Sequence, residues 1–524
     1  MRQNSATIAA SSRETVPGII RMNSENGSQI DWFIFLVGTA LLLAVVIPIV
    51  VAPDWSIGII NAAFQFITSQ FGVYYVMAAS IIFVFLLWLG VSRFGGIVLG
   101  PQGTTPAYSK FSWAAMLFCT GIGGSLIYWG AAEWAFYISD PPYGIQPDSD
   151  AAVVWASTYG MFHWGPVAWG LYCLPTIAFC CSYHIREVPI LRLSAACGSA
   201  LGRYTDRWPG RVIDLFFIVG LLGTAATGLA FGTSIVSSSI TKLTGLPDDF
   251  RMQLVILILA TSLIAYSVYR GLDKGIKVLS LINASLVLLF IAFVLVVGPT
   301  AFILEMGVTS IGHMFQNFIK MTTWTDPLRK AQFVETWTIF YWAWWIALGP
   351  FVGMFVAKIS RGRTVREVVF GMLGWGSIGC ALFFIVLGNY SLDLELNGVY
   401  PVKEQALGES PSTAIAAIIE LLPFGSFWLF FIAVVGIIFT ATTYDSASYT
   451  LSAGATRYLK ADEHPLRAHR VYWAIALGSL PAALLFLRGL TALQTASVVA
   501  SVPILIIYVL LAWSIVKTLR LQSE

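Results

Sequence analysis

Long apolar stretches recur along the whole chain, and they restrict its fold more than any other feature. A helix needs about 20 predominantly apolar residues to cross a bilayer. Such stretches can be counted twelve times, and they lie at 32–52, 72–92, 112–138, 153–182, 211–240, 251–269, 276–297, 333–359, 365–388, 425–456, 467–487 and 494–517. We therefore predict an all-α polytopic membrane protein with twelve transmembrane helices.

The composition favours the same class. Of the 524 residues, 57% are hydrophobic and 11% are charged, whereas a soluble domain carries about 25% charged residues. The net charge of +3 gives no reason to expect a nucleic-acid partner. The six cysteines have the spacing of neither a metal site nor a disulfide framework. The sequence also shows no phosphate-binding loop and no cluster of catalytic side chains, so we do not expect an enzyme.

Lysine and arginine are distributed unevenly between alternate loops. If both termini are cytoplasmic, 23 of the 30 basic residues fall on the inside. Those on the outside are Lys242, Arg251, Lys320, Arg329, Lys330, Lys403 and Arg488. Because cytoplasmic loops carry an excess of these residues, we predict that both termini lie in the cytoplasm.

Two of the predicted spans contain residues that weaken a helix. The third holds Gly121, Gly123 and Gly124, and the eighth holds Gly349–Pro350. Irregular backbone at membrane depth is tolerated only where it is buried or lines a cavity. The two spans run in opposite directions, and each begins a set of five. We therefore predict inverted repeats with a substrate between them at mid-membrane; the alternative is that the glycines only permit close helix packing.

Aromatic side chains gather in two of the spans. Trp344 and Trp345 lie near the middle of the eighth, too deep for an interfacial belt. Trp164, Trp169 and Tyr172 lie in the fourth. Aromatic faces that line a cavity attract cations that cannot donate hydrogen bonds, each contact contributing about 0.5–2 kcal/mol. The pattern predicts a cage for a quaternary ammonium group, with ordinary packing of aromatics as the alternative.

Polar residues within the spans are the remaining candidates. Glu133 and Asp445 are the acids there, and a structural and a functional role are equally open for each. We expect His163 to belong to a packing or polar network. Thr442 and Thr443 offer hydroxyl oxygens to a sodium ion, although threonines in membrane helices often bond their own backbone.

One stretch resembles a known family. The run "FYWAWWIALGPFVGMFVAKISRGRTVRE" at 340–367 is similar to the signature of the betaine/carnitine/choline transporter family. The runs "YWGAAEW" and "HWGPVAWGLY" match in order and spacing, and the resemblance covers roughly 30–520. It implies a LeuT-like fold of two inverted five-helix repeats with two extra N-terminal helices. It also implies a trimer in a bacterial inner membrane that transports a trimethylammonium or related onium compound.

The spans and the resemblance together divide the chain into six segments. These are a disordered cytosolic tail (1–30), two peripheral helices (31–110), the first repeat (111–300), an amphipathic surface connector (301–332), the second repeat (333–517) and a short cytosolic tail (518–524).

The resemblance also implies roles for single residues. The aromatic box would consist of Trp164, Trp169, Tyr172, Trp344 and Trp345, with Trp342 as a close neighbour, Phe351 on the inward path and Ser125 beside the substrate. Choline carriers of the family tend to have an aspartate near Ser125. Its absence here favours a zwitterion such as glycine betaine, carnitine or dimethylsulfoniopropionate.

The resemblance further implies sodium as the coupling ion, with no organic cofactor. The ligands would be the hydroxyls of Thr442 and Thr443 and the carbonyls of Cys119, Ile122 and Phe439. Sodium-independent carnitine/γ-butyrobetaine antiporters of the family carry arginine where this chain has Asn283 and methionine where it has Val352. Both differences favour sodium symport, and sodium-independent exchange is the alternative.

Overall fold

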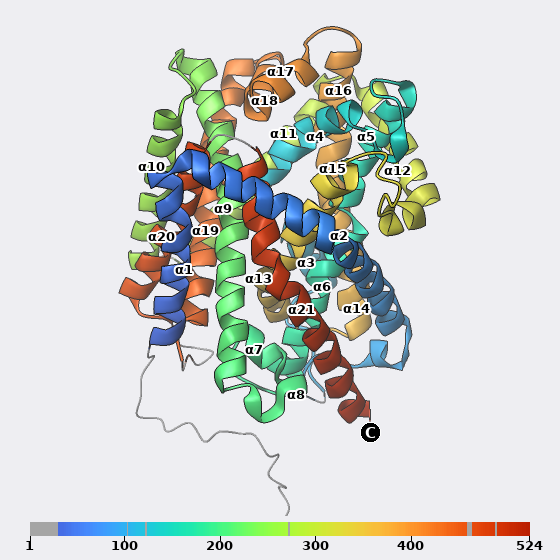
Figure 1. Ribbon diagram of the computed structural model, residues 1–524. Coiled ribbons are helices and arrows are strands. Elements are labelled where there is room, and N and C mark those ends of the chain that lie inside the picture. Colours follow the sequence, from blue (N-terminus) through green and yellow to red (C-terminus); the bar gives the residue numbers. More distant parts are fainter. Residues whose placement is uncertain are drawn as a thin grey trace, which may run out of the picture.

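The protein is almost entirely helical. The structure, a computed structural model, describes residues 30–101, 103–120, 123–270, 273–457, 459, 464–487 and 490–523. Within these ranges the only extended pairs are isolated bridges, Ile30 with Thr456 and Val98 with Thr364. Long helices run side by side through the body of the molecule, and shorter ones cap both of its ends (Figure 1). The predicted all-α architecture is confirmed.

The helices begin and end at defined residues. The first half of the chain contains α1 (Trp32–Val51), α2 (Pro53–Val91), α3 (Lys110–Thr120), α4 (Gly124–Ser139), α5 (Asp150–His163), α6 (Pro166–Cys180), α7 (Leu193–Ala196), α8 (Gly198–Leu201), α9 (Trp208–Thr244), α10 (Phe250–Arg270) and α11 (Asp273–Val297). The second half contains α12 (Thr300–Thr323), α13 (Ile339–Ile359), α14 (Val365–Gly371), α15 (Ser377–Phe383), α16 (Asn389–Leu396), α17 (Val402–Gly408), α18 (Pro411–Glu420), α19 (Gly425–Gly454), α20 (Arg467–Phe486) and α21 (Leu490–Ser523).

Short π-helical and 3₁₀ turns join several of these helices. The π-helical turns are η3 (Cys181–Ile185), η5 (Val334–Thr338), η6 (Met372–Gly376) and η7 (Phe384–Gly388), and the 3₁₀ turns are η1 (Arg93–Gly96), η2 (Pro142–Gly144) and η4 (Gly202–Tyr204). Side chains cap several starts: the Ser149 hydroxyl accepts from the Ala152 amide at the start of α5. Thr364 and Glu367 form a reciprocal capping box at the start of α14.

Many of the helices are suited to a bilayer. Among the described residues, nine helices are long and apolar enough to cross it, or eleven if each bent pair counts as one span. The bent pairs are α3 with α4, at 60°, and the segment Leu281–Val297 with α12, at 109°. A multi-pass membrane protein is therefore supported, while the number twelve and the inverted repeat stay predictions.

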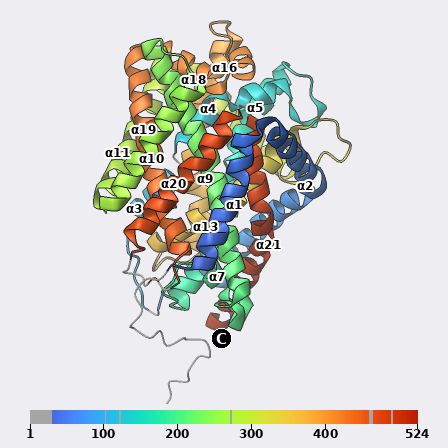
Figure 2. The ribbon, with the colours of Figure 1, turned by 60° about the vertical axis from the view of Figure 1, so that its left-hand side comes forward.

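The loops predicted to lie outside meet at one end of the molecule. Lys242, in the last turn of α9, forms an ion pair of 3.0 Å with Glu420 of α18. Lys403 of α17 pairs with Asp148 at 2.7 Å. Figures 1 and 2 show α16 and α18 at the end opposite the C-terminus.

The opposite end gathers both ends of the described chain. Asp31, before α1, lies 3.6 Å from Arg211 and 3.4 Å from Arg457. The Ser199 hydroxyl of α8 lies 2.7 Å from that of Thr518 near the end of α21. The described chain thus begins and ends on one side, as an even number of crossings requires. Which side faces the cytoplasm stays a prediction.

The two predicted interruptions have different outcomes. The third span is interrupted, since α3 ends at Thr120 and α4 starts at Gly124; Gly121 lies outside the described residues. The break predicted at Gly349–Pro350 is wrong, because α13 is helical from Ile339 to Ile359. A partner from another helix compensates for the proline there, as described below. The helix keeps its course, packs against α6 and brings Trp345 to Tyr172 of that helix.

Candidate functional site

Three aromatic rings from the fourth and eighth predicted spans form a box. Trp345 of α13 is its central wall. Trp164, at the C-terminal end of α5, lies with its ring centroid 4.7 Å from that of Trp345 and its plane turned by 72°. Tyr172 of α6 lies 5.6 Å from Trp345, with its plane turned by 80°. Two side rings thus stand nearly perpendicular to the ring of Trp345, an arrangement whose aromatic faces could serve a compact cation.

Trp344 forms a second layer against this box. Its ring is stacked on Trp345 at a centroid distance of 4.9 Å and an angle of 10°. Phe340, one turn earlier, is stacked on Trp344 at 5.4 Å and 23°. Trp344 also lies edge-on to Trp164 at 5.9 Å. The structure therefore brings Trp344 to the site, chiefly as support for Trp345.

Two further predicted residues lie at the edges of the box. Trp169 lies perpendicular to Tyr172 at 5.6 Å, and its indole fills the space beside Gly376, where a Cβ atom would be 2.2 Å from the ring. Trp342 is fully buried and packs against Phe162 at 5.6 Å. Trp169 thus extends the box through Tyr172, whereas the ring contacts of Trp342 are with Phe162 and His163 of α5.

Phe351 and Ser125 are half-buried. Phe351 follows Pro350 in α13 and packs against the core. Ser125 lies in the first turn of α4 and faces α9, since a Cβ atom at Gly228 would be 3.5 Å from the Ser125 hydroxyl. The same atom would be 3.4 Å from the Tyr444 hydroxyl of α19. Ser125 thus occupies a meeting point of three helices, where a larger side chain would reach α9.

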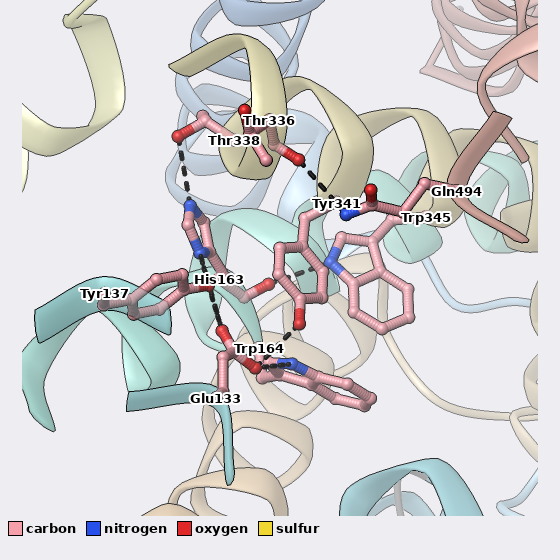
Figure 3. Close-up of polar contacts among 9 residues, drawn as sticks. All are labelled: Glu133, Tyr137, His163, Trp164, Thr336, Thr338, Tyr341, Trp345 and Gln494. Atoms are coloured by element: carbon pink, nitrogen blue, oxygen red, sulfur yellow. Dashed lines mark hydrogen bonds and ion pairs between the residues drawn. The ribbon is translucent and has the colours of Figure 1, made fainter. Parts of the chain in front are cut away.

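A buried carboxyl group holds one wall of the box. Glu133 of α4 is fully buried, and its Oε2 accepts from the indole Nε1–H of Trp164 at 3.3 Å and from the Tyr341 hydroxyl at 2.7 Å. Its Oε1 accepts from the Tyr137 hydroxyl. Figure 3 shows these groups converging on Glu133 from three helices. Glu133 therefore holds the indole ring of Trp164 in its orientation through this hydrogen bond.

His163 connects that carboxyl group to the other wall. Its Nδ1 lies 2.8 Å from the Tyr137 hydroxyl and its Nε2 lies 3.1 Å from the Thr338 hydroxyl. Its carbonyl accepts from the indole Nε1–H of Trp345 at 2.8 Å. This carbonyl is available because α5 ends at His163, and the last carbonyls of a helix lack helical partners. The expected polar network around His163 is present (Figure 3).

The residues of the predicted sodium site are less closely grouped. Thr442 is buried, and its hydroxyl donates to the Ile438 carbonyl at 3.0 Å and the Phe439 carbonyl at 3.3 Å. This is the bonding to its own backbone that was the alternative. Thr443 is exposed. The predicted hydroxyl ligands therefore have different surroundings.

The carbonyl ligands predicted on the third span are placed only in part. Cys119 is half-buried near the end of α3, which packs against η6, α13 and α15. Helix α19 packs mainly against α9, α10, α11 and α20. Ile122 lies outside the described residues. No hydrogen bond of the described residues joins Cys119 to α19, so the sodium site stays a prediction.

Sequence reasoning missed two hydroxyls that the site uses. Tyr137 lies four residues after Glu133, a spacing that places both side chains on one helix face, so a local signal existed. Tyr341 comes from another span, and no local pattern connects it to Glu133. A separate hydrogen bond joins α21 to η5 next to this network: the Gln494 side chain donates to the Thr336 carbonyl at 3.3 Å (Figure 3).

The fold and the box define a multi-pass helical membrane protein with a buried cluster of aromatic side chains. Comparison with known families makes this specific. The family model described as BCCT, betaine/carnitine/choline family transporter, matches residues 33–524. The chain belongs to this family of transporters.

Several curated relatives are similar over most of their length. A carnitine transporter of Acinetobacter baumannii is 34% identical over 488 residues, covering 93% of this chain and 88% of the relative. The glycine betaine transporter OpuD of Bacillus subtilis is 34% identical over 504 residues, covering 94% and 95%. A high-affinity choline transport protein of Escherichia coli is 30% identical over 505 residues, covering 96% and 74%.

Proposed function

We propose that this protein imports an onium zwitterion, such as glycine betaine, carnitine or dimethylsulfoniopropionate, by sodium symport with alternating access. The observation that carries the proposal is the arrangement of Trp164 and Tyr172 around the ring of Trp345. A trimethylammonium group has no N–H to donate, so aromatic faces suit it better than hydrogen-bond acceptors do. We further propose a homotrimer in a bacterial inner membrane, with both termini in the cytoplasm.

The choice of a zwitterion rests on Ser125. This residue stands near the position where choline carriers of the family tend to have an aspartate. A ligand with its own carboxylate does not need a protein acid to balance its charge, whereas choline does. The hydroxyl of Ser125 supplies no such charge.

The choice of symport rests on Asn283 and the two threonines. Asn283 is fully buried and donates from Nδ2 to the Val435 carbonyl of α19 at 3.3 Å. It stands where sodium-independent antiporters of the family carry an arginine, so that fixed positive charge is missing. A bound sodium ion would supply a positive charge in its place, with Thr442 and Thr443 as ligands. Sodium-independent exchange is the second candidate.

Ligand binding by purified protein tests the box. Glycine betaine, carnitine, γ-butyrobetaine, choline and dimethylsulfoniopropionate would each be titrated in sodium and in potassium. Trp345→Leu keeps apolar bulk but removes the aromatic face, and we expect affinity to fall by about thirtyfold or more. Trp428→Leu is the matched control, because Trp428 is buried against Phe290 and Phe293, away from the box. Equal affinities of the two variants would contradict the proposal.

Uptake into proteoliposomes tests the coupling. Symport requires an inward sodium gradient, and full uptake by sodium-free vesicles preloaded with substrate would instead establish exchange. Thr443→Ala should raise the sodium concentration needed for half-maximal uptake. Thr450→Ala, on the same helix, should leave it unchanged, because Thr450 is not one of the proposed ligands.

A further inference from the structure

Two prolines leave two carbonyl groups without helical partners. Pro175 lies within α6 and Pro350 lies within α13. Proline has no N–H, so the carbonyl four residues earlier loses its intrahelical hydrogen bond. The carbonyls concerned belong to Leu171 and Ile346. A buried carbonyl without a donor is destabilising, so each of the two needs a partner from elsewhere.

One hydroxyl group from a third helix serves both carbonyls. Tyr508 of α21 is buried, and its hydroxyl lies 2.9 Å from the Leu171 carbonyl and 3.1 Å from the Ile346 carbonyl. Its single hydrogen is shared between the two acceptors. Space for the hydroxyl comes from Gly349, where a Cβ atom would lie 2.1 Å from it. The shared bond explains why α13 stays helical across Gly349–Pro350.

These carbonyls are next to two walls of the aromatic box. Leu171 precedes Tyr172 on α6, and Ile346 follows Trp345 on α13. The hydroxyl reaches both carbonyls only while α6 and α13 keep their present separation. That same separation holds the rings of Tyr172 and Trp345 at 5.6 Å. The bond therefore stabilises the assembled box relative to any arrangement in which the two helices part.

We propose that Tyr508 is a positioning residue for the onium site, which sets the spacing of Tyr172 and Trp345 through the carbonyls of Leu171 and Ile346. This inference rests on the proposed function, in which the box binds an onium ligand. Tyr508 need not touch the ligand. Helix α21 would thus influence the affinity for the ligand through the hydrogen bonds of Tyr508 to two backbone carbonyls.

The test compares two tyrosine variants. Each loses one buried hydroxyl that forms a hydrogen bond between α21 and another helix. Tyr508→Phe removes the shared donor. Tyr75→Phe is the matched control, because the Tyr75 hydroxyl of α2 lies 2.6 Å from the Ser501 hydroxyl of α21 and Tyr75 is fully buried. We expect Tyr508→Phe to raise the Kd for glycine betaine or carnitine about tenfold, and Tyr75→Phe to change it less than about twofold. Both variants should lower the melting temperature.

A rescue experiment distinguishes positioning from general destabilisation. Pro350→Ala restores an N–H that can donate to the Ile346 carbonyl within α13. In the Tyr508→Phe background it should therefore recover part of the lost affinity, so that Tyr508→Phe costs less affinity when Pro350→Ala is present than when it is absent. If Tyr508→Phe does not yield folded protein, recovery of folding and binding by the double variant supports the proposal. Failure of the double variant overturns it.

Other outcomes are equally decisive. A Kd for Tyr508→Phe equal to that of Tyr75→Phe overturns the proposal, whatever the melting temperatures. A wild-type protein that binds none of the onium ligands overturns the proposed function, and this inference with it. Wild-type binding together with unchanged binding by Tyr508→Phe overturns this inference alone.

Discussion

The Glu133→Met substitution would show whether the buried carboxyl group orients the box. Methionine has a similar length and no strong acceptor, so the three donors that meet Glu133 lose their partner. The Tyr137 hydroxyl can turn to Nδ1 of His163, which is 2.8 Å away. The Tyr341 hydroxyl and the Trp164 indole N–H lose the carboxylate oxygen to which both donate. The indole can only donate.

The magnitude follows from those two donors. Leaving one buried donor unsatisfied costs about 1–3 kcal/mol, so the variant should lose about 2–6 kcal/mol of combined stability and binding free energy. The share of this free energy that comes from the Trp164 indole N–H affects ligand binding, because Trp164 is a wall of the box. If that share is about 2 kcal/mol, onium affinity falls about thirtyfold.

Glu133→Gln provides the matched control. Its amide oxygen can still accept from Trp164 and Tyr341, and its NH₂ group can donate to the Tyr137 hydroxyl, which can then donate to His163. We expect its affinity for glycine betaine or carnitine to stay within about threefold of the wild type. Isothermal titration calorimetry or quenching of tryptophan fluorescence would measure both variants. Wild-type affinity for Glu133→Met would refute the reasoning. So would an equal loss in both variants, since charge rather than hydrogen bonding would then be the requirement.

Two further predictions concern space beside the site. Gly349→Ala should lower the melting temperature and cost about 1–3 kcal/mol, because its Cβ atom would displace the Tyr508 hydroxyl; thermal unfolding would measure this. Gly374→Ala, whose Cβ atom meets nothing within 4 Å, is the control and should be nearly neutral, so an equal loss would contradict the steric argument. Ser125→Asp should raise the affinity for choline relative to glycine betaine, because it introduces a carboxylate near the position where choline carriers of the family tend to have an aspartate. Competition binding would measure the ratio, and an unchanged ratio would exclude Ser125 from substrate selection.

The sequence predicts the parts of this site that depend on local patterns. Apolar length predicts the spans, and the family resemblance implies that Trp164, Trp344 and Trp345 meet. A tryptophan in the sequence does not show which ring it will pack against, however, so the stacking of Trp344 behind Trp345 could not be predicted. That division of roles depends on side-chain angles set by Phe340 and by packing between helices.

The wrong prediction of a helix break at Gly349–Pro350 shows what the sequence alone cannot decide. The missing N–H of Pro350 is certain from the sequence, and so is the need of the Ile346 carbonyl for another donor. A break in the helix is one solution and a donor from a distant segment is another. Tyr508 supplies that donor from α21, a contact that only the tertiary fold brings about. The same glycine that predicts a weak helix is needed to admit the tyrosine hydroxyl.

The hydrogen bonds of the walls bear on the kind of ligand. The indole N–H of Trp164 is held by Glu133 and that of Trp345 by the His163 carbonyl. Both polar edges are therefore committed to the protein, and what these rings present to a ligand is their π-surface. A primary ammonium ion would give up strong hydrogen bonds to water and find no acceptor on these two walls. A trimethylammonium group gives up no such bonds, so under the proposed function this arrangement would favour it even before the ligand's carboxylate is considered.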